Sequence, residues 1–358
     1  MEIPTDSIPR LPDDLIVEIL TWLPVKPVLR CRCVCKSWLS LISTPQFVRS
    51  HLRKSKQGSN YAHHRVMLIC RGDIKQCSVP CLLREPIIDT FDTDYSVPFW
   101  LQPNRIMGSC DGLICHVIDR KGLFLWNPST RVWKKLPDFG FNENFGIFAY
   151  GLGFDKSSDD YKVVVVLIGG RDSNEVAVKV YSLKTDQWKR IENFKGRWLR
   201  DNRAAFVHGK LHWIANYDRE FKSGWKIVSL DLGTEEYGVL EMPKNVEIGW
   251  YKKLGASEEC LYMLCSNLTS ADVWIMDDYG VGKRTWTKVA SVPCIGDFPA
   301  HQYRSVLYVL ENGEVVLHCG LKLVIFNPKD CSIRCPEIRD ANELIAAKTY
   351  IESLVSPL

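Results

Sequence analysis

The amino-acid sequence predicts an α+β multidomain protein, in which a small helical domain precedes a mainly antiparallel β-propeller, with six blades as the expected number. Hydrophobic residues follow the period of a helix between residues 9 and 50, and the period of a strand from about residue 60 onward. In the second region one strand–turn–strand pattern returns about every fifty residues, which is typical of propeller blades. We therefore expect a helical domain at 9–50, a linker at 51–62 and a propeller at 63–355.

The N-terminal region carries more apolar surface than a segment of about 40 residues can bury by itself. Pro12 suits the first turn of a helix, and Pro24 and Pro27 predict a corner, after which a second helical pattern runs to Thr44-Pro45. The apolar positions are Leu15, Ile19, Trp22 and Leu23 in one stripe, Ile16 and Leu20 in a second stripe beside it, and Val28, Leu29, Val34, Trp38, Leu41 and Ile42 in the second pattern.

The second region repeats an apolar strand, a polar turn of about four residues and a large residue on the returning strand. The turns start at Asn127, Ser182, Asp231 and Asn327, and the large residues are Trp133, Trp188, Tyr237 and Ile333, with a fifth copy that has a longer turn and ends at Trp286. Turn residues such as Asn-Pro preset the bend, and the returning large residue is expected to pack on the strand that the chain has just left.

One period has room for four strands, as in AAFV, KLHWIAN, KIVSLD and EYGVLEM. Five blades are apparent in this way. The stretches RVMLIC and CSVPCLL, near residues 65–83, suggest part of a sixth blade, and AKTYIESLVS near the C-terminus is expected to supply its missing strand and close the ring. A pair of β-sandwiches is the alternative, and the regular spacing favours the propeller.

Positive charge is concentrated at the front of the chain. Residues 1–58 contain nine Lys or Arg and five Asp or Glu, whereas the rest contains 37 of each. The run of Arg49, Arg53, Lys54 and Lys56 is typical of a solvated helix end, and a nucleic-acid-binding arm is the less favoured interpretation. The polar first ten residues do not resemble a signal peptide and no segment suits a membrane span, so we expect a cytoplasmic or nuclear protein.

No set of residues predicts a catalytic centre, a cofactor or a metal site. The 14 cysteines are expected to be reduced, because no export signal precedes them, and no pair has the Cys-x-x-Cys spacing of a zinc site. His208 and His212 have the spacing of a zinc helix, but they lie in a strand pattern and lack the glutamate. The 12 tryptophans mostly recur at blade positions, which favours core packing over stacking on ligands.

The N-terminal helices resemble the F-box. The matching residues are Leu11-Pro12 and Leu23-Pro24 for its two Leu-Pro pairs, the segment 32–38 (RCVCKSW) for its last helix, and Pro45 and Phe47 for its tail. The rest of the chain resembles the associated domain of plant F-box/kelch-repeat proteins, in GSCDGLICH, LFLWNPSTRVWKKLP and YIESLVSP. One blade fits the kelch pattern, with Gly169-Gly170, Tyr181 and Trp188, and the other blades lack the double glycine.

This resemblance implies a substrate receptor of an SCF-type ubiquitin ligase. The F-box would pack on the helices of a Skp-type adaptor, which leads to a cullin and a RING ligase, and the propeller would hold a protein target for ubiquitination and degradation. No substrate-binding residue, nucleic acid or membrane is implied. The expected adaptor contacts are Leu11, Pro12, Leu15, Ile19, Leu23, Pro24, Leu29, Val34 and Trp38.

Two alternatives remain open. The chain could be an adaptor-bound scaffold that does not cause degradation, or a propeller enzyme with a metal in its central channel. The enzyme would need convergent ligands, and the eight histidines are scattered. Relatives of this type act in plant defence, hormone responses and pollen self-incompatibility, and the ending YIESLVSP favours the defence group.

Overall fold

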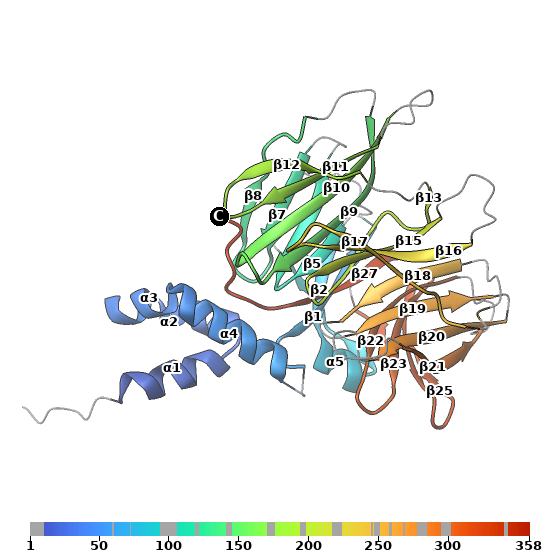
Figure 1. Ribbon diagram of the computed structural model, residues 1–358. Coiled ribbons are helices and arrows are strands. Elements are labelled where there is room, and N and C mark those ends of the chain that lie inside the picture. The colour runs from blue at the N-terminus through green and yellow to red at the C-terminus, as the bar shows by residue number, and fades with distance from the viewer. Residues whose placement is uncertain are drawn as a thin grey trace, which may run out of the picture.

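In the computed structural model, four N-terminal helices lie beside a six-bladed ring of antiparallel sheets (Figure 1). The expected propeller is thereby confirmed, and the alternative of paired β-sandwiches is wrong. The structure describes residues 11–58, 61–71, 73–93, 106–118, 122–140, 145–169, 176–193, 198–216, 224–244, 246, 251–257, 260–267, 269–277, 285–294, 302–339 and 343–358.

The helical region is more divided than its sequence suggests. Its helices are α1 (Asp13–Trp22), α2 (Val25–Cys31), α3 (Lys36–Ile42) and α4 (Pro45–Gln57). The prediction of one continuous pattern from Val28 to Ile42 was wrong, because Cys35 adopts an extended backbone, with φ of −160°, between α2 and α3. Its sulfur accepts a hydrogen bond from the Trp38 backbone N–H at 3.5 Å and so caps the start of α3.

α4 starts where the helical pattern was expected to stop. The Thr44 hydroxyl accepts a hydrogen bond from the Phe47 N–H at 3.2 Å, and Pro45 occupies the first turn. The helix continues into the segment 51–62 that was expected to be a linker, because Leu52 is buried against the propeller. The division at 9–50, 51–62 and 63–355 stays a prediction. No helix among the described residues is long and apolar enough to cross a membrane.

The first three sheets follow the order of the chain, except that the first of them takes its inner strand from the C-terminus. The first sheet contains β27 (Leu344–Ile351), β1 (His64–Cys70), β2 (Asp73–Ser78) and β4 (Phe91–Asp92). The second contains β5 (Ile106–Cys110), β6 (Leu113–Ile118), β7 (Gly122–Asn127) and β8 (Val132–Lys135). The third contains β9 (Phe145–Asp155), β10 (Asp160–Gly169), β11 (Val176–Ser182) and β12 (Gln187–Ile191).

The other three sheets repeat this plan. The fourth contains β13 (Trp198–Leu199), β14 (Ala205–Val207), β15 (Lys210–Asn216), β16 (Trp225–Asp231) and β17 (Tyr237–Leu240), close to the four strands expected there. The fifth contains β18 (Tyr251–Ala256), β19 (Leu261–Ser266), β20 (Ser270–Asp277) and β21 (Thr285–Pro293). The sixth contains β22 (Tyr303–Val309), β23 (Val315–Cys319), β24 (Lys322–Asn327) and β25 (Ser332–Arg334). A short parallel pair, β3 (Ile87–Ile88) and β26 (Glu337–Ile338), lies outside the six.

The two ends of the propeller meet in the first sheet. β27 pairs antiparallel with β1 from His64↔Ile351 onward, as expected for RVMLIC and AKTYIESLVS. The stretch CSVPCLL is only partly a strand, because Ser78 caps a short helix, α5 (Val79–Arg84), by accepting a hydrogen bond from the Cys81 N–H. The ring is therefore closed by backbone pairing between distant parts of the chain.

The repeated turns share one geometry. In the second sheet the Arg131 N–H donates to the Asn127 carbonyl at 2.8 Å, and Arg131 has a left-handed backbone with φ of 62°. The residues at the same place in three other turns are Asp186, Glu235 and Cys331, with φ of 58°, 61° and 57°. Beyond each turn the large residue returns along the strand just left, and its side chain packs there, for example Trp133 on Phe124 and Trp188 on Tyr181, as predicted.

The apolar core lies between neighbouring sheets. Each of the six boundaries holds one cluster of buried side chains. In β10, Val163 and Val165 face the second sheet, whereas Val164 and Val166 face the fourth. Because both faces of a blade are buried, its central strands are continuously apolar rather than alternating.

Candidate functional site

One side of α1 leaves large apolar side chains in water. Leu15, Ile19 and Trp22 lie on successive turns and are 51%, 52% and 53% exposed, and Leu11, just before the helix, is 57% exposed. Leu20, on the other side of α1, is 2% exposed and packs with the other helices. The second stripe thus contributes to the core of the helical domain, and Leu15, Ile19 and Trp22 of the first stripe are surplus to that core.

The nine residues expected at an adaptor fall into two groups. Six of them are exposed, namely Leu11, Pro12, Leu15, Ile19, Pro24 and Val34. Three are half-buried against the core of the helical domain, namely Leu23, Leu29 and Trp38. The structure therefore leaves the first group free for a partner and gives the second group a role in holding the helices together.

Two exposed apolar residues of the helical domain were not among the nine adaptor contacts expected from the sequence. Trp22 shares the helical spacing of Leu15 and Ile19, and that spacing could have identified it as part of the same exposed face. The Trp22 indole N–H donates to Glu18 at 2.9 Å, and the Lys54 ammonium lies 4.1 Å from the Trp22 ring centre. Leu39 is 47% exposed and gave no signal, because the break at Cys35 resets the helical register.

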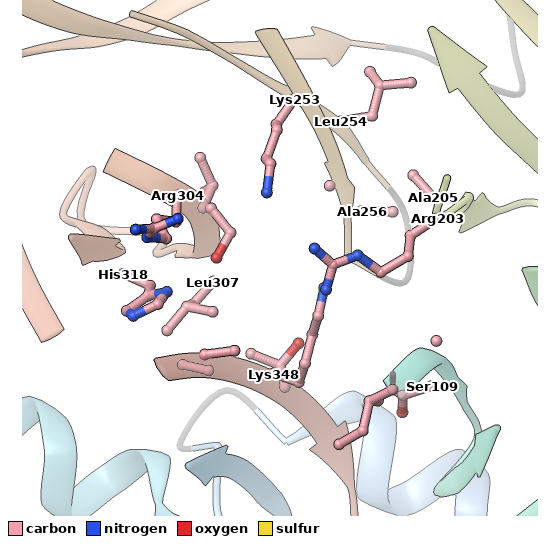
Figure 2. Close-up of a pocket in the computed structure, with 18 of the residues that line it drawn as sticks. Ser109, Arg203, Ala205, Lys253, Leu254, Ala256, Arg304, Leu307, His318 and Lys348 are labelled. Carbon is pink, nitrogen blue, oxygen red and sulfur yellow. The ribbon is translucent and has the colours of Figure 1, made fainter. Parts of the chain in front are cut away.

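The inner strands of the propeller enclose a second candidate site, a cavity of about 340 Å³. Figure 2 shows Arg203, Lys253, Arg304, Lys348 and His318 around it. They come from the segment before β14 and from β18, β22, β27 and β23 in turn, and five of the six sheets contribute to the lining.

One carboxylate balances these bases. Asp201 lies 3.4 Å from the Arg203 guanidinium and 3.6 Å from the Lys253 ammonium. Burial opposes ionisation of Asp201, yet the charges of these two bases hold its pKa below the ordinary value. The site is thus predominantly positive, with Arg203, Lys253 and Lys348 half-buried and Arg304 exposed.

Two further side chains of the cavity are protonated less readily than usual. Burial, together with the charges of Arg203 and Lys253, lowers the pKa of Lys348 to about 7. Burial, with Arg304 as the next cause, lowers the pKa of His318 to about 4. The imidazole Nε2 of His318 has no hydrogen-bond partner among the described residues.

The histidine pair noted in the sequence does not form a metal site. His208 lies exposed in a turn with φ of 47°, whereas His212 is buried in β15 with Nδ1 3.1 Å from the Ala205 carbonyl. Within the described ranges, no group of three or more His, Cys, Asp or Glu side chains could hold a metal ion. In the double glycine of the kelch pattern, Gly169 ends β10 and Gly170 lies outside the described residues.

Comparison with known families agrees with this architecture. Residues 8–50 match the F-box domain, and residues 85–356 match the F-box associated beta propeller domain. The chain belongs to the F-box proteins with an associated β-propeller. Its N-terminal helices are therefore an F-box, and the resemblance expected from the sequence is confirmed.

Two relatives from Arabidopsis thaliana match this F-box protein over nearly its whole length. An F-box/kelch-repeat protein is 30% identical over 360 residues, which cover 97% of this chain and 96% of the relative. F-box protein CPR1 is 29% identical over 377 residues, which cover 96% of this chain and 88% of the relative.

The F-box is fixed to the propeller through α4 and the C-terminal tail. The Lys56 ammonium lies 2.5 Å from Asp111, and the Arg49 guanidinium lies 2.6 Å from Asp159. Leu354 packs into the F-box core, and the next residue, Val355, packs into the propeller. In Figure 1 the tail runs between the helices and the sheets. This double attachment favours one orientation of the F-box on the propeller.

Proposed function

We propose that this protein is the substrate receptor of an SCF-type ubiquitin ligase. In this proposal the F-box binds a Skp-type adaptor through the exposed side chains of α1 and its flanks, and the propeller binds a protein target. The observation that carries it is that Leu15 and Ile19 remain half exposed although the F-box has a complete core beneath them. The family match supports the same conclusion.

The chain would act by proximity. It holds the target close to the conjugating enzyme and so raises the effective concentration of the target, without forming a bond itself. Such a mechanism requires a firm connection between the two binding regions. The buried contacts of Leu52, Leu354 and Val355, with the ion pair between Lys56 and Asp111, supply one.

Charged substitutions in the exposed stripe test the adaptor contact. The double variant Leu15→Glu with Ile19→Glu should weaken adaptor binding by about a hundredfold or more. Each change loses about 1 kcal/mol of apolar burial and places an unpaired carboxylate in the interface. Calorimetric titration of the full chain with a Skp-type adaptor measures this. Leu11→Ala with Pro12→Ala should weaken binding in the same direction by a smaller factor.

Leu321→Glu is the matched control, because Leu321 is 52% exposed in a turn of the propeller. It should leave adaptor affinity unchanged. Equal affinities for the wild type and the α1 double variant, with both proteins folded by circular dichroism, would refute the proposed contact.

Degradation of a target separates the ligase from the scaffold. Proteins that co-purify with the propeller of the α1 double variant in plant cells are candidate targets. Under the ligase proposal such a protein accumulates when the variant replaces the wild type, and its ubiquitination falls. Unchanged abundance and ubiquitination of every retained partner would favour a non-degradative scaffold.

A further inference from the structure

The central channel concentrates positive charge in a domain that is otherwise balanced. The chain beyond residue 58 contains 37 basic and 37 acidic residues. Among the described residues that line the cavity, however, four are basic and one is acidic. The four bases come from four separate sheets of the ring.

Part of that charge is uncompensated within the protein. Asp201 pairs with Arg203 and Lys253. Arg304 and Lys348 have no ion-pair partner among the described residues. Arg203, Lys253 and Lys348 are half-buried and share one carboxylate, Asp201, so their repulsion is only partly offset and an anion in the channel would be stabilised.

A buried polar atom faces the same space. His318 is 2% exposed and lines the cavity, and its Nε2 lacks a hydrogen-bond partner among the described residues. An unpaired polar atom in the interior is unfavourable, and a ligand oxygen can remove that penalty by accepting a hydrogen bond once the ring is protonated. In Figure 2 His318 lies beside Arg304, on the side of the cavity opposite Arg203.

We propose that the central channel binds a small phosphate ester, held by Arg203, Lys253, Arg304 and Lys348. A phosphate ester carries about −1.5 to −2 charges at neutral pH, which compensates the bases that Asp201 leaves unpaired. Arginine forks suit its oxygens, and lysine adds mobile ammonium donors. A volume of about 340 Å³ lies at the small end of ligand pockets and suits a compact metabolite.

The pH dependence of binding has a definite sign. A bound anion stabilises the Lys348 ammonium, which otherwise has a pKa of about 7 beside Arg203, Lys253 and Asp201. The contribution of Lys348 is therefore complete below pH 7 and declines as the pH rises through the higher pKa of the complex. Protonation of His318, which faces Arg304, would strengthen binding further at lower pH.

Calorimetric titration of the purified full chain with inorganic phosphate, pyrophosphate and glucose 6-phosphate tests the proposal, with glucose as the uncharged control. We expect at least one of the phosphate probes to bind and raise the melting temperature, and glucose to do neither. Lys348→Met removes the charge but keeps the length of the side chain, and should weaken binding by about tenfold or more. Its melting temperature without ligand should not fall, because the substitution relieves repulsion.

The matched control is Lys135→Met, at an exposed position of β8 away from the channel, which should leave binding unchanged. The proposal is overturned if no phosphate probe binds, or if Lys348→Met and Lys135→Met affect binding equally. Binding of a phosphoserine peptide alone would also overturn it, and would assign the channel to the target protein. The measurement needs no adaptor, so it stands or falls separately from the ligase proposal.

Discussion

Two asparagines at equivalent turn positions make different sets of hydrogen bonds in this protein. Asn127 and Asn327 both open a repeated turn, and each accepts a hydrogen bond from the N–H two residues ahead. Asn127 is also fully buried, and its amide donates to the carbonyls of Ser353 and Val355 at 3.0 and 2.7 Å. It therefore joins the second blade to the C-terminal tail.

Replacement of these two residues should separate the roles. Asn127→Ala should lower the free energy of unfolding by about 2–3 kcal/mol, because two tail carbonyls lose their donor in a buried place. Asn327→Ala, which breaks only an exposed turn contact, should lower it by less than about 1 kcal/mol. Urea unfolding of the two variants measures the difference, and equal losses would contradict the role given to Asn127.

Gly112 shows why the sequence could not foresee this junction. It has φ of 85°, and a Cβ there would lie 2.3 Å from the Ser353 hydroxyl. The stretches GSCDGLICH, LFLWNPSTRVWKKLP and YIESLVSP were recognised as separate pieces of one family pattern. In the structure these stretches meet around the C-terminal tail. The contacts join residues more than 200 positions apart, so no local sequence pattern predicts them.

At the scale of elements, periodicity predicted the strands and helix faces better than the helix ends. The strand–turn repeat identified the blades because each turn and its returning large residue lie close together in sequence. The break at Cys35 was missed because it depends on one extended residue, and Leu39 was missed with it. The basic channel was also missed, because its members come from five different segments that only the closed ring brings together.

The junction between α4 and the first blade contains three buried histidines. The rings of His51 and His63 meet edge to face at 5.7 Å, and His64 Nδ1 lies 3.2 Å from the Tyr308 hydroxyl. Burial lowers the pKa of all three, with that of His64 falling to about 4. His63 and Arg65 add like charge to this effect.

The junction should therefore loosen in mild acid. Below the ordinary histidine pKa of 6.5 the unfolded chain binds protons that the folded chain does not bind. The free energy of unfolding is therefore highest above that pH and falls toward pH 4. His64→Gln should flatten this fall by up to about 1.4 kcal/mol per pH unit. Because the pKa of His318 is also lowered to about 4, part of the dependence of stability on pH should remain in this variant.

Thermal unfolding between pH 7 and pH 4 measures that effect. His208→Gln, a change at an exposed turn, is the control and should retain the wild-type profile. A profile of His64→Gln that coincides with the wild type would show that the junction histidines do not govern acid stability.

At the scale of the whole molecule, the closure of the ring and the attachment of the F-box use the same segment. β27 completes the first blade, and the tail that follows it packs between the F-box and the propeller. Folding of the propeller therefore also fixes where the F-box sits. One face of the F-box is occupied by this attachment and the stripe on α1 is left open.

Hydrogen exchange of the full chain with and without a Skp-type adaptor measures whether the adaptor covers the exposed side chains of α1. We expect slower exchange in α1, α2 and α3 when the adaptor is present, since the half-exposed Leu15 and Ile19 become covered, and unchanged exchange in the six sheets. Slower exchange in the propeller, with none in residues 11–42, would contradict it.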